Sequence, residues 1–178
     1  MNLRRATSAD VPALQRLIEE SVRVLSRNHY TPTQIESALR YVFGADTQLI
    51  ADGTYYVVPT PDAGLAAAGG WSRRATLYGG DQMKGTADPL LDPERDPARI
   101  RAFFVHPAWT RRGLASQIFA RCVREASSAG FRSLELMATL PGEPLYRSLG
   151  FLEIERLVTT LPDGSGLPVV RMRRSLVS

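Results

Sequence analysis

The sequence predicts a single α/β (α+β) domain with a mixed central sheet flanked by helices, and three observations carry that prediction. First, 178 residues suit one domain of ordinary size and leave no room for a second full core. Second, segments with strand and helix periodicity follow one another in the order β-α-α-β-β-loop-β-α-β-α-β-β. Third, one strand–helix–strand unit requires a parallel pair, whereas the hairpins on both sides of it are antiparallel.

The first half of the chain combines strands with two helices. An apolar stripe from Val11 to Leu25 recurs at three- and four-residue spacing, as in an amphipathic helix, and Pro12 suits its first turn. A second helix starts after Thr31 and ends at Gly44. The expected elements are a strand over 3–6, helices over 11–28 and 31–43, and the two strands of a hairpin over 54–58 and 65–71.

The second half contains the strand–helix–strand unit. The run IRAFFVH is apolar on both faces, which is typical of a central strand, and Pro107 stops it. Between the halves lies a long loop at about 72–97, which has three Asp-Pro steps and no periodic spacing of apolar residues. The expected elements are strands over 100–106 and 133–139, helices over 113–128 and 144–149, and a final hairpin over 151–160 and 167–175.

Composition excludes several classes of protein. A net charge of +4, with 44% hydrophobic and 22% charged residues, is typical of a globular rather than a disordered chain. Cys122 is the only cysteine, which excludes an internal disulfide framework and a cysteine-based zinc cluster. Lys84 is the only lysine, so 21 of the 22 basic residues are arginine.

Partners and location are constrained as well. The basic balance raises the question of nucleic acid, but the arginines are scattered and no aromatic platform for stacked bases accompanies them. No apolar stretch is long enough to span a membrane, and the first residues lack the apolar core of a secretory signal. We therefore expect a cytoplasmic protein with no membrane or nucleic-acid partner.

The most informative segment covers residues 101–119. A buried strand stops at Pro107, and a short loop carrying Arg111 and Arg112 enters a helix through Gly113. The first amides of a helix have no internal partners and bind phosphate, and a glycine lets a ligand approach the backbone closely. Two interpretations follow: a site for a pyrophosphate-like anion, or a joint between strand and helix with solvated arginines.

This segment resembles the acyl-CoA-binding motif of the GCN5-related N-acetyltransferases (GNAT), Gln/Arg-x-x-Gly-x-Gly/Ala, with Gly113 and Ala115 at the two small positions. The phrase Phe-Val-His-Pro over 104–107 resembles the family's strand leading into that loop. Residues 144–151, Pro-Leu-Tyr-Arg-Ser-Leu-Gly-Phe, resemble its Phe-Tyr-x-x-x-Gly-Phe element. The resemblance covers nearly all of the chain and is loosest over 70–97.

The resemblance implies a GNAT-type mixed central sheet with splayed parallel strands, a single N-acetyltransferase domain over 1–178, and acetyl-CoA as co-substrate without a metal. Backbone groups of Phe103, Phe104 and Val105 would then bind the pantetheine arm and the acetyl group. Tyr146 matches the tyrosine that protonates the departing CoA thiolate, although a tyrosine of the core is the alternative. The loop and helix start implied to hold the pyrophosphate comprise Arg111, Arg112, Gly113, Leu114, Ala115 and Ser116.

Two positions depart from the family pattern. Thr110 occupies the Gln/Arg position, so one phosphate contact is lost or passes to Arg111. Thr139 occupies the place where many relatives have an asparagine that contacts the pantetheine, and it is kept as a cofactor-binding candidate.

The general base is not identified by the sequence. Glu143 and Glu94 are candidates, whereas His106 is interpreted as a residue at the strand end and His29 as a surface residue. The five acidic residues of 79–97 leave two interpretations open: an ordinary solvated loop, or a field that favours a cationic amine.

The expected function is an acyl-CoA-dependent N-acyltransferase. It would move an acetyl group from acetyl-CoA directly to a primary amine of a small molecule or a peptide. The alternative is a non-catalytic acyl-CoA-binding or sensory module of the same fold. The expected partner is the amine acceptor, and a homodimer is the oligomer considered.

Overall fold

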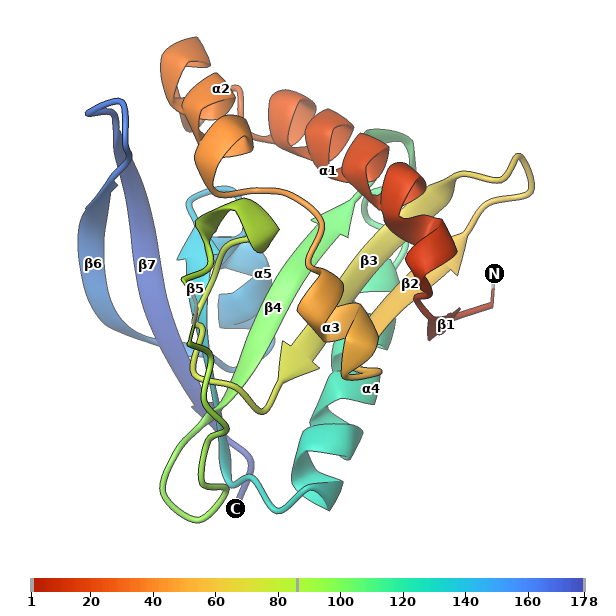
Figure 1. Ribbon diagram of the computed structural model, residues 1–178, viewed down its shortest axis with the longest axis vertical. Helices are drawn as coiled ribbons and strands as arrows, with labels where there is room; N and C mark the ends of the chain where they lie inside the picture. Colours follow the sequence, from red (N-terminus) through yellow and green to blue (C-terminus); the bar gives the residue numbers. More distant parts are fainter. Residues whose placement is uncertain (1, 86, 178) are drawn as a thin grey trace.

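The structure is a computed structural model, which describes residues 2–85 and 87–177. Within these ranges seven strands form one mixed sheet (Figure 1), with every neighbouring pair antiparallel except one. In chain order the strands are β1 (Arg4–Arg5), β2 (Tyr55–Pro59), β3 (Leu65–Ser72), β4 (Ala98–Val105), β5 (Ser133–Thr139), β6 (Leu152–Thr160) and β7 (Gly166–Ser175). Their order in the sheet is β1-β2-β3-β4-β5-β7-β6.

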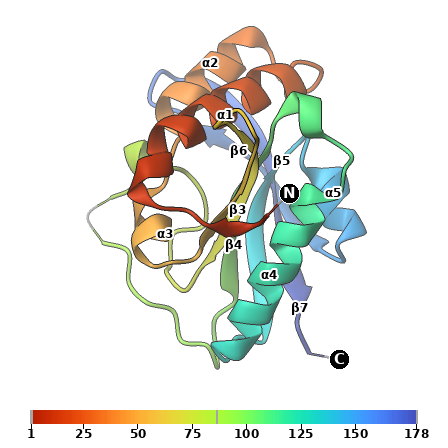
Figure 2. The same ribbon diagram turned by 90° about the vertical axis from the view of Figure 1, so that its right-hand side faces the viewer.

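Five α-helices of the described chain cover the two faces of the sheet (Figure 2). They are α1 (Val11–Leu25), α2 (Pro32–Tyr41), α3 (Thr47–Ala51), α4 (Leu114–Ser128) and α5 (Glu143–Ser148). The first three lie on one face, and α4 and α5 lie on the other. Among the described helices, none combines the length and the apolar character needed to cross a bilayer.

Each long helix buries the apolar stripe that the sequence predicts. Leu14, Leu17 and Ile18 of α1 are buried, and so are Ile118 and Phe119 of α4. Burying such side chains is the main source of helix stability in a domain of this size, at roughly 1.5–3 kcal/mol for each large one. The two faces of the sheet therefore carry separate apolar clusters, which sandwich the strands.

The parallel strands diverge soon after they pair. β4 pairs with β5 at two positions, Ala98 with Leu134 and Arg99 with Glu135. Farther along, β4 stays paired with β3, and β5 stays paired with β7 over its full length. The splayed parallel pair that the resemblance implies is confirmed, and it leaves two facing strand edges without a strand partner.

Ion pairs hold the sheet together where the parallel pair begins. The buried Glu135 carboxylate accepts hydrogen bonds from Arg99 of β4 at 3.3 Å and from Arg173 of β7 at 3.0 Å, and it also pairs with Arg171. Burial opposes ionisation of this carboxyl, but the arginines outweigh it, so the pKa of Glu135 lies below its ordinary value. This carboxylate ties three strands together at the junction of the two halves of the sheet.

A bulge in β4 follows the junction. Ala102 has a left-handed backbone with φ of 54°, and the register with β3 shifts there, so β4 carries one extra residue. The Tyr55 hydroxyl donates a hydrogen bond to the Ala102 carbonyl at 3.2 Å. On β3, a Cβ at Gly69 would come within 2.8 Å of the Phe103 ring. The bulge thus depends on a hydroxyl at Tyr55 and on a residue without a side chain at Gly69.

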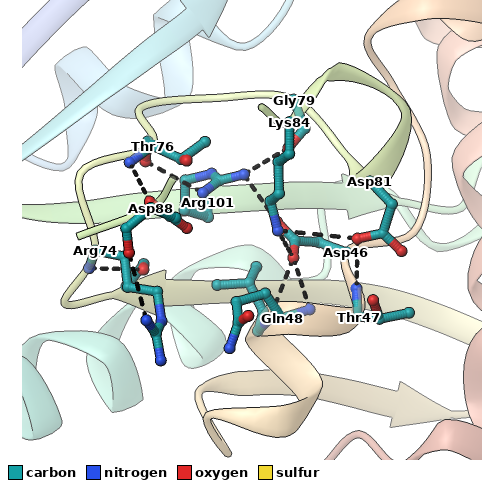
Figure 3. A network of polar contacts seen from close by, with 12 residues as sticks. Asp46, Thr47, Gln48, Arg74, Thr76, Gly79, Asp81, Lys84, Asp88 and Arg101 are labelled. Carbon is teal, nitrogen blue, oxygen red and sulfur yellow. Dashed lines mark hydrogen bonds and ion pairs between the residues drawn. The ribbon is translucent and has the colours of Figure 1, made fainter. Parts of the chain in front are cut away.

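The long loop is held in place by a buried ion-pair network (Figure 3). Asp46 is fully buried, caps the first turn of α3, and pairs with Arg101 at 2.8 Å and with Lys84. The Arg101 guanidinium also donates to the carbonyl oxygens of Thr76 at 3.2 Å and Gly79 at 2.5 Å. The only lysine of the chain and a buried arginine therefore fix the loop to the body of the protein.

The acidic residues of the loop mostly stabilise its own turns. Asp88 accepts from the Thr76 amide at 2.8 Å, and Asp81 accepts from the Thr47 amide at 3.0 Å. Asp96 accepts from the Asp92 amide, also at 2.8 Å. These carboxylates serve local structure, as in the interpretation of an ordinary loop.

Most predicted elements agree with the structure to within a few residues. The strand expected over 133–139 coincides with β5, and the helix expected over 113–128 begins one residue later because Gly113 is its N-cap. Helix α1 ends at Leu25, three residues before the predicted end at Asn28. The sequence analysis missed α3, which is five residues long and depends on its cap at Asp46.

Candidate active site

A cavity of about 940 Å³ opens where β4 and β5 diverge. One part of its wall comes from the starts of α4 and α5, on one face of the sheet, and we name this part the α4 arm. Another part comes from the end of α1, residues 42–44 and residues 77–80, on the other face, and we name it the α1 arm. The cavity therefore passes through the sheet at the gap between the parallel strands.

Ten of the eleven predicted site residues line this cavity. They are Phe103, Phe104, Val105, Arg111, Gly113, Leu114, Ala115, Ser116, Thr139 and Tyr146. Arg112 is the exception, because its guanidinium lies over the Trp109 ring, 4.6 Å from the centroid. The arrangement brings together residues that lie far apart in the sequence, and the ligand contacts of each one stay a prediction.

The start of α4 presents backbone amides to the cavity. Arg111 and the N-cap Gly113 both have left-handed backbones, with φ of 60° and 75°. No side chain of residues 2–85 or 87–177 caps this helix, so the amides of its first turn are free to bind an anion at the positive end of the helix dipole. A Cβ at Gly113 would meet no atom within 4 Å, so backbone conformation rather than crowding requires glycine here.

Tyr146 of α5 faces the same arm. Its ring makes edge-to-face contacts with Phe103, at a centroid distance of 6.4 Å, and with Phe151, at 5.9 Å. Burial raises the pKa of Tyr146 above its ordinary value, so the phenol stays protonated at neutral pH. Its hydroxyl makes no hydrogen bond within the described ranges, and this leaves it free to donate to a ligand in the cavity.

The two departures from the family pattern have structural partners. The Thr110 hydroxyl donates to the Pro107 carbonyl at 3.2 Å and helps to close the turn before α4. The Thr139 hydroxyl accepts from the Gly142 amide at 3.3 Å, at the turn into α5. Both threonines line the cavity while they stabilise its rim.

None of the base candidates lines the cavity. Glu143 pairs with Arg147 at 2.8 Å and with Arg156. His106 accepts from the Ala108 amide at Nδ1 and lies 2.6 Å from the Glu20 carboxylate at Nε2, outside the main cavity. The interpretation of His106 as a residue at the strand end agrees with this position. Glu94 lies in the loop, where its amide donates to Asp92.

The α1 arm contains residues that the sequence analysis did not assign to a site. Ser21 of α1 and Ser26, the C-cap that follows it, line this arm together with Phe43 and Tyr78. The Tyr78 hydroxyl lies 2.9 Å from Thr159 Oγ1. A signal was present, because two serines interrupt the apolar stripe of α1. That signal is ambiguous, because the same stripe equally predicts a helix face that packs on the core.

A comparison with models of known protein families matches residues 77–176 to the acetyltransferase (GNAT) domain. This match covers more than half of the chain, including β4 through β7, the start of α4 and Tyr146. A comparison with curated proteins finds no match.

Solved structures share the fold at low sequence identity. A GCN5-related N-acetyltransferase from Rhodopseudomonas palustris has a TM-score of 0.70 and 18% identity, with 98% of this chain and 94% of that one covered. A GNAT superfamily phosphinothricin acetyltransferase from Sinorhizobium meliloti, in complex with AcCoA, has a TM-score of 0.62 and 20% identity, with 98% and 87% covered. The ribosomal-protein-S18-alanine N-acetyltransferase from Escherichia coli has a TM-score of 0.60 and 16% identity, with 99% and 94% covered.

The family match and the splayed sheet agree with each other. The matched region holds the helix start that presents free amides and the tyrosine that faces it across the cavity. The chain belongs to the GNAT acetyltransferase family, whose members are acetyl-CoA-dependent N-acetyltransferases.

Proposed function

We propose that this protein transfers an acetyl group from acetyl-CoA directly to a primary amine of a small molecule or a peptide. The observation that carries the proposal is the cavity that passes through the sheet, with its two arms on opposite faces. Two substrates entering from opposite faces would meet in the gap between β4 and β5. Bringing two reactants together in this way is a large part of the catalysis of a direct transfer.

The α4 arm is proposed to hold the CoA moiety. The amides from Arg111 to Ser116 would bind the pyrophosphate, and the left-handed backbones at Arg111 and Gly113 support this by exposing the free amides of the helix start. Backbone groups of 103–105 would bind the pantetheine arm along the unpaired edge of β4. When bound there, acetyl-CoA supplies the thioester carbonyl that an amine attacks.

Tyr146 is proposed as the general acid. A phenol that keeps its proton at neutral pH and has no hydrogen-bond partner among the described residues suits donation to a leaving thiolate. The rings of Phe103 and Phe151 pack against the Tyr146 ring, and these contacts would hold its hydroxyl in one orientation.

The test is release of free thiol from acetyl-CoA by the purified protein in the presence of a broad panel of primary amines. The proposal expects turnover with at least one amine and an acetylated product by mass spectrometry. Binding of CoA without turnover across the whole panel would instead support the non-catalytic, sensory alternative. Absence of CoA binding would overturn both.

A further inference from the structure

The α1 arm has an apolar wall. Its aliphatic and aromatic side chains come from α1, from the segment after α2, and from the two diverging strands, and they include Val22, Leu25, Val42, Phe43, Phe104 and Met137. Leu25 is 37% exposed, which places this arm next to the surface at the end of α1. A wall of this kind favours an apolar body and disfavours a charged one.

No carboxylate and no imidazole lines the cavity among the described residues. The titratable side chains in its wall are Tyr78, Arg101, Arg111 and Tyr146. The guanidinium of Arg101 is already paired with Asp46 and with the carbonyls of Thr76 and Gly79. A second positive charge on the substrate would find no counter-ion, and a negative charge would find no free cation in this arm.

Two serines are the polar exception. Ser21 is 5% exposed and Ser26 is 4% exposed, both line the arm, and neither hydroxyl makes a hydrogen bond within the described part of the chain. The buried side-chain oxygen or nitrogen without a partner among the described residues is Thr54 Oγ1 alone, so the hydroxyls of Ser21 and Ser26 are open to the cavity. Each is therefore free to form a hydrogen bond with a ligand there. A hydroxyl or carbonyl group on the ligand would pair with either of them.

We propose that the acceptor is a primary amine on an apolar body that carries no second charge and presents a neutral hydrogen-bonding group to Ser21 or Ser26. This proposal rests on the proposed function, since it describes the amine that the same cavity would accept. It replaces the idea of a cationic acceptor attracted by the loop, because none of the five acidic residues of that loop lines the cavity.

The lack of a basic side chain has a chemical consequence. An ammonium has no lone pair, so the acceptor must reach the thioester as the neutral amine, after it has lost a proton to water. The C–N bond then forms and the C–S bond breaks. Tyr146 donates its proton to the leaving sulfur, and the phenolate is reprotonated by the surplus proton that the nitrogen releases. The pH dependence of kcat/KM should therefore follow the pKa of the amine itself.

A series of four amines with the same six-carbon chain tests the substrate class. Hexylamine, aminohexanol, diaminohexane and aminohexanoate differ only in the far end, which is apolar, neutral polar, cationic or anionic. We expect kcat/KM to be highest for aminohexanol, and the two charged amines to fall below hexylamine by at least about tenfold. If diaminohexane or aminohexanoate is the best substrate, the inference is wrong while the proposed function stands. If no amine releases thiol, the proposed function itself fails.

Serine variants test the hydrogen-bonding group. In the double variant Ser21→Ala and Ser26→Ala, kcat/KM for aminohexanol should fall about fivefold, toward that of hexylamine, with hexylamine unchanged. Ser128→Ala, on the exposed end of α4, is the matched control and should change neither amine. An equal loss for both amines would show that the serines act only through structure, and no loss for either would remove them from recognition.

The pH dependence of kcat/KM gives a third test of the inference. Profiles of kcat/KM measured with an aliphatic amine and with a fluorinated amine of lower pKa should shift by the difference between the two amine pKa values. A low-pH limb of the profile that stays at one pH for both amines would reveal a base on the protein and overturn the neutral-amine part of the inference.

Discussion

Among single residues, Tyr146 combines a protonated hydroxyl with a fixed ring. Burial keeps the phenol neutral, and contacts with Phe103 and Phe151 leave the ring little freedom to turn. Tyr146 lines the cavity and differs in this from Tyr30. The Tyr30 hydroxyl already donates to the Pro168 carbonyl at 2.6 Å and accepts from the Leu140 amide. The buried Tyr30 thus has a structural role, whereas the hydroxyl of the half-buried Tyr146 is available to a ligand.

Replacing Tyr146 by phenylalanine should separate catalysis from binding. Tyr146→Phe keeps the ring contacts and removes the proton donor, so we expect kcat to fall about 100-fold while the Kd for CoA is unchanged. Steady-state kinetics and calorimetric titration with CoA measure the two effects. Tyr41→Phe, which does not touch the cavity, serves as the control. An unchanged kcat at every pH would remove Tyr146 from the acid role.

How far the sequence predicts the site depends on what kind of signal each residue carries. Gly113 and Tyr146 belong to local patterns, so their presence in one cavity follows from correct motifs on correctly predicted elements. Ser21 and Ser26 carry no such pattern, because a buried serine in a helix stripe has the same sequence signature whether it faces a core or a cavity. Arg112 shows the converse. An arginine suits a phosphate, but the Arg112 guanidinium lies over the Trp109 ring and Arg112 does not line the cavity.

At the scale of elements, the strand and helix patterns are strong because each is local. Strand β5 places Leu134, Leu136 and Ala138 at alternate positions, and α1 and α4 carry apolar stripes. The bulge at Ala102 is different, since an alanine with positive φ gives no signal in the sequence and is maintained by Tyr55 and Gly69 from other strands. The divergence of β4 from β5 likewise arises from tertiary pairing.

The start of α4 offers a test with a matched control. Gly113→Val forces a branched side chain into a left-handed backbone beside the amides of the helix start, and we expect CoA to bind at least about tenfold more weakly. Gly164, at the tip of the β6–β7 hairpin, also has a positive φ of 87° and open space for a Cβ. Gly164→Val should lower the melting temperature to a similar degree and leave CoA affinity intact. Equal losses of affinity in both variants would contradict the assignment of the anion site.

The junction of the parallel pair is a second test at this scale. Glu135→Gln leaves three arginines facing a neutral group, and because two of them are partly exposed we expect the free energy of unfolding to fall by about 2 kcal/mol. Glu155→Gln is the control, since Glu155 is more exposed and lies 3.8 Å from Arg171; it should cost less than about 0.5 kcal/mol. Denaturant titrations measure both, and equal effects would show that Glu135 has no special role.

For the whole molecule, stability in acid depends on carboxylates that the fold keeps ionised. Asp10 joins the first strand to α1, accepting two hydrogen bonds from Arg4 at 2.8 Å and one from the Thr7 amide at 2.7 Å. The bond from Arg4 is the main cause that lowers the pKa of Asp10 to about 2. A carboxyl with a lowered pKa stabilises the folded state above its unfolded pKa, and this contribution disappears as pH falls through the folded value.

Asp10→Asn should therefore lower the free energy of unfolding by about 1 kcal/mol at neutral pH, a figure reduced because Arg4 is partly exposed. The difference from the unchanged protein should shrink as pH falls from about 4 to about 2, where the native carboxyl is protonated as well. Urea titrations across that range measure it. Glu36→Gln, at an ion pair with Arg23 that is exposed on both sides, should show little difference at any pH. A constant difference for Asp10→Asn at all pH values would contradict the assignment.

The position of Lys84 affects how readily the protein can acetylate its own side chains. An enzyme that acetylates amines works beside its own lysines, and each accessible one competes with the substrate and is open to self-modification. This chain has a single lysine, whose side chain is 13% exposed and pairs with the buried Asp46. The remaining positive side chains are arginines, which keep their protons at any physiological pH and do not accept an acetyl group. The chain therefore carries a net charge of +4 with a single lysine amine, and that amine is mostly buried in an ion pair.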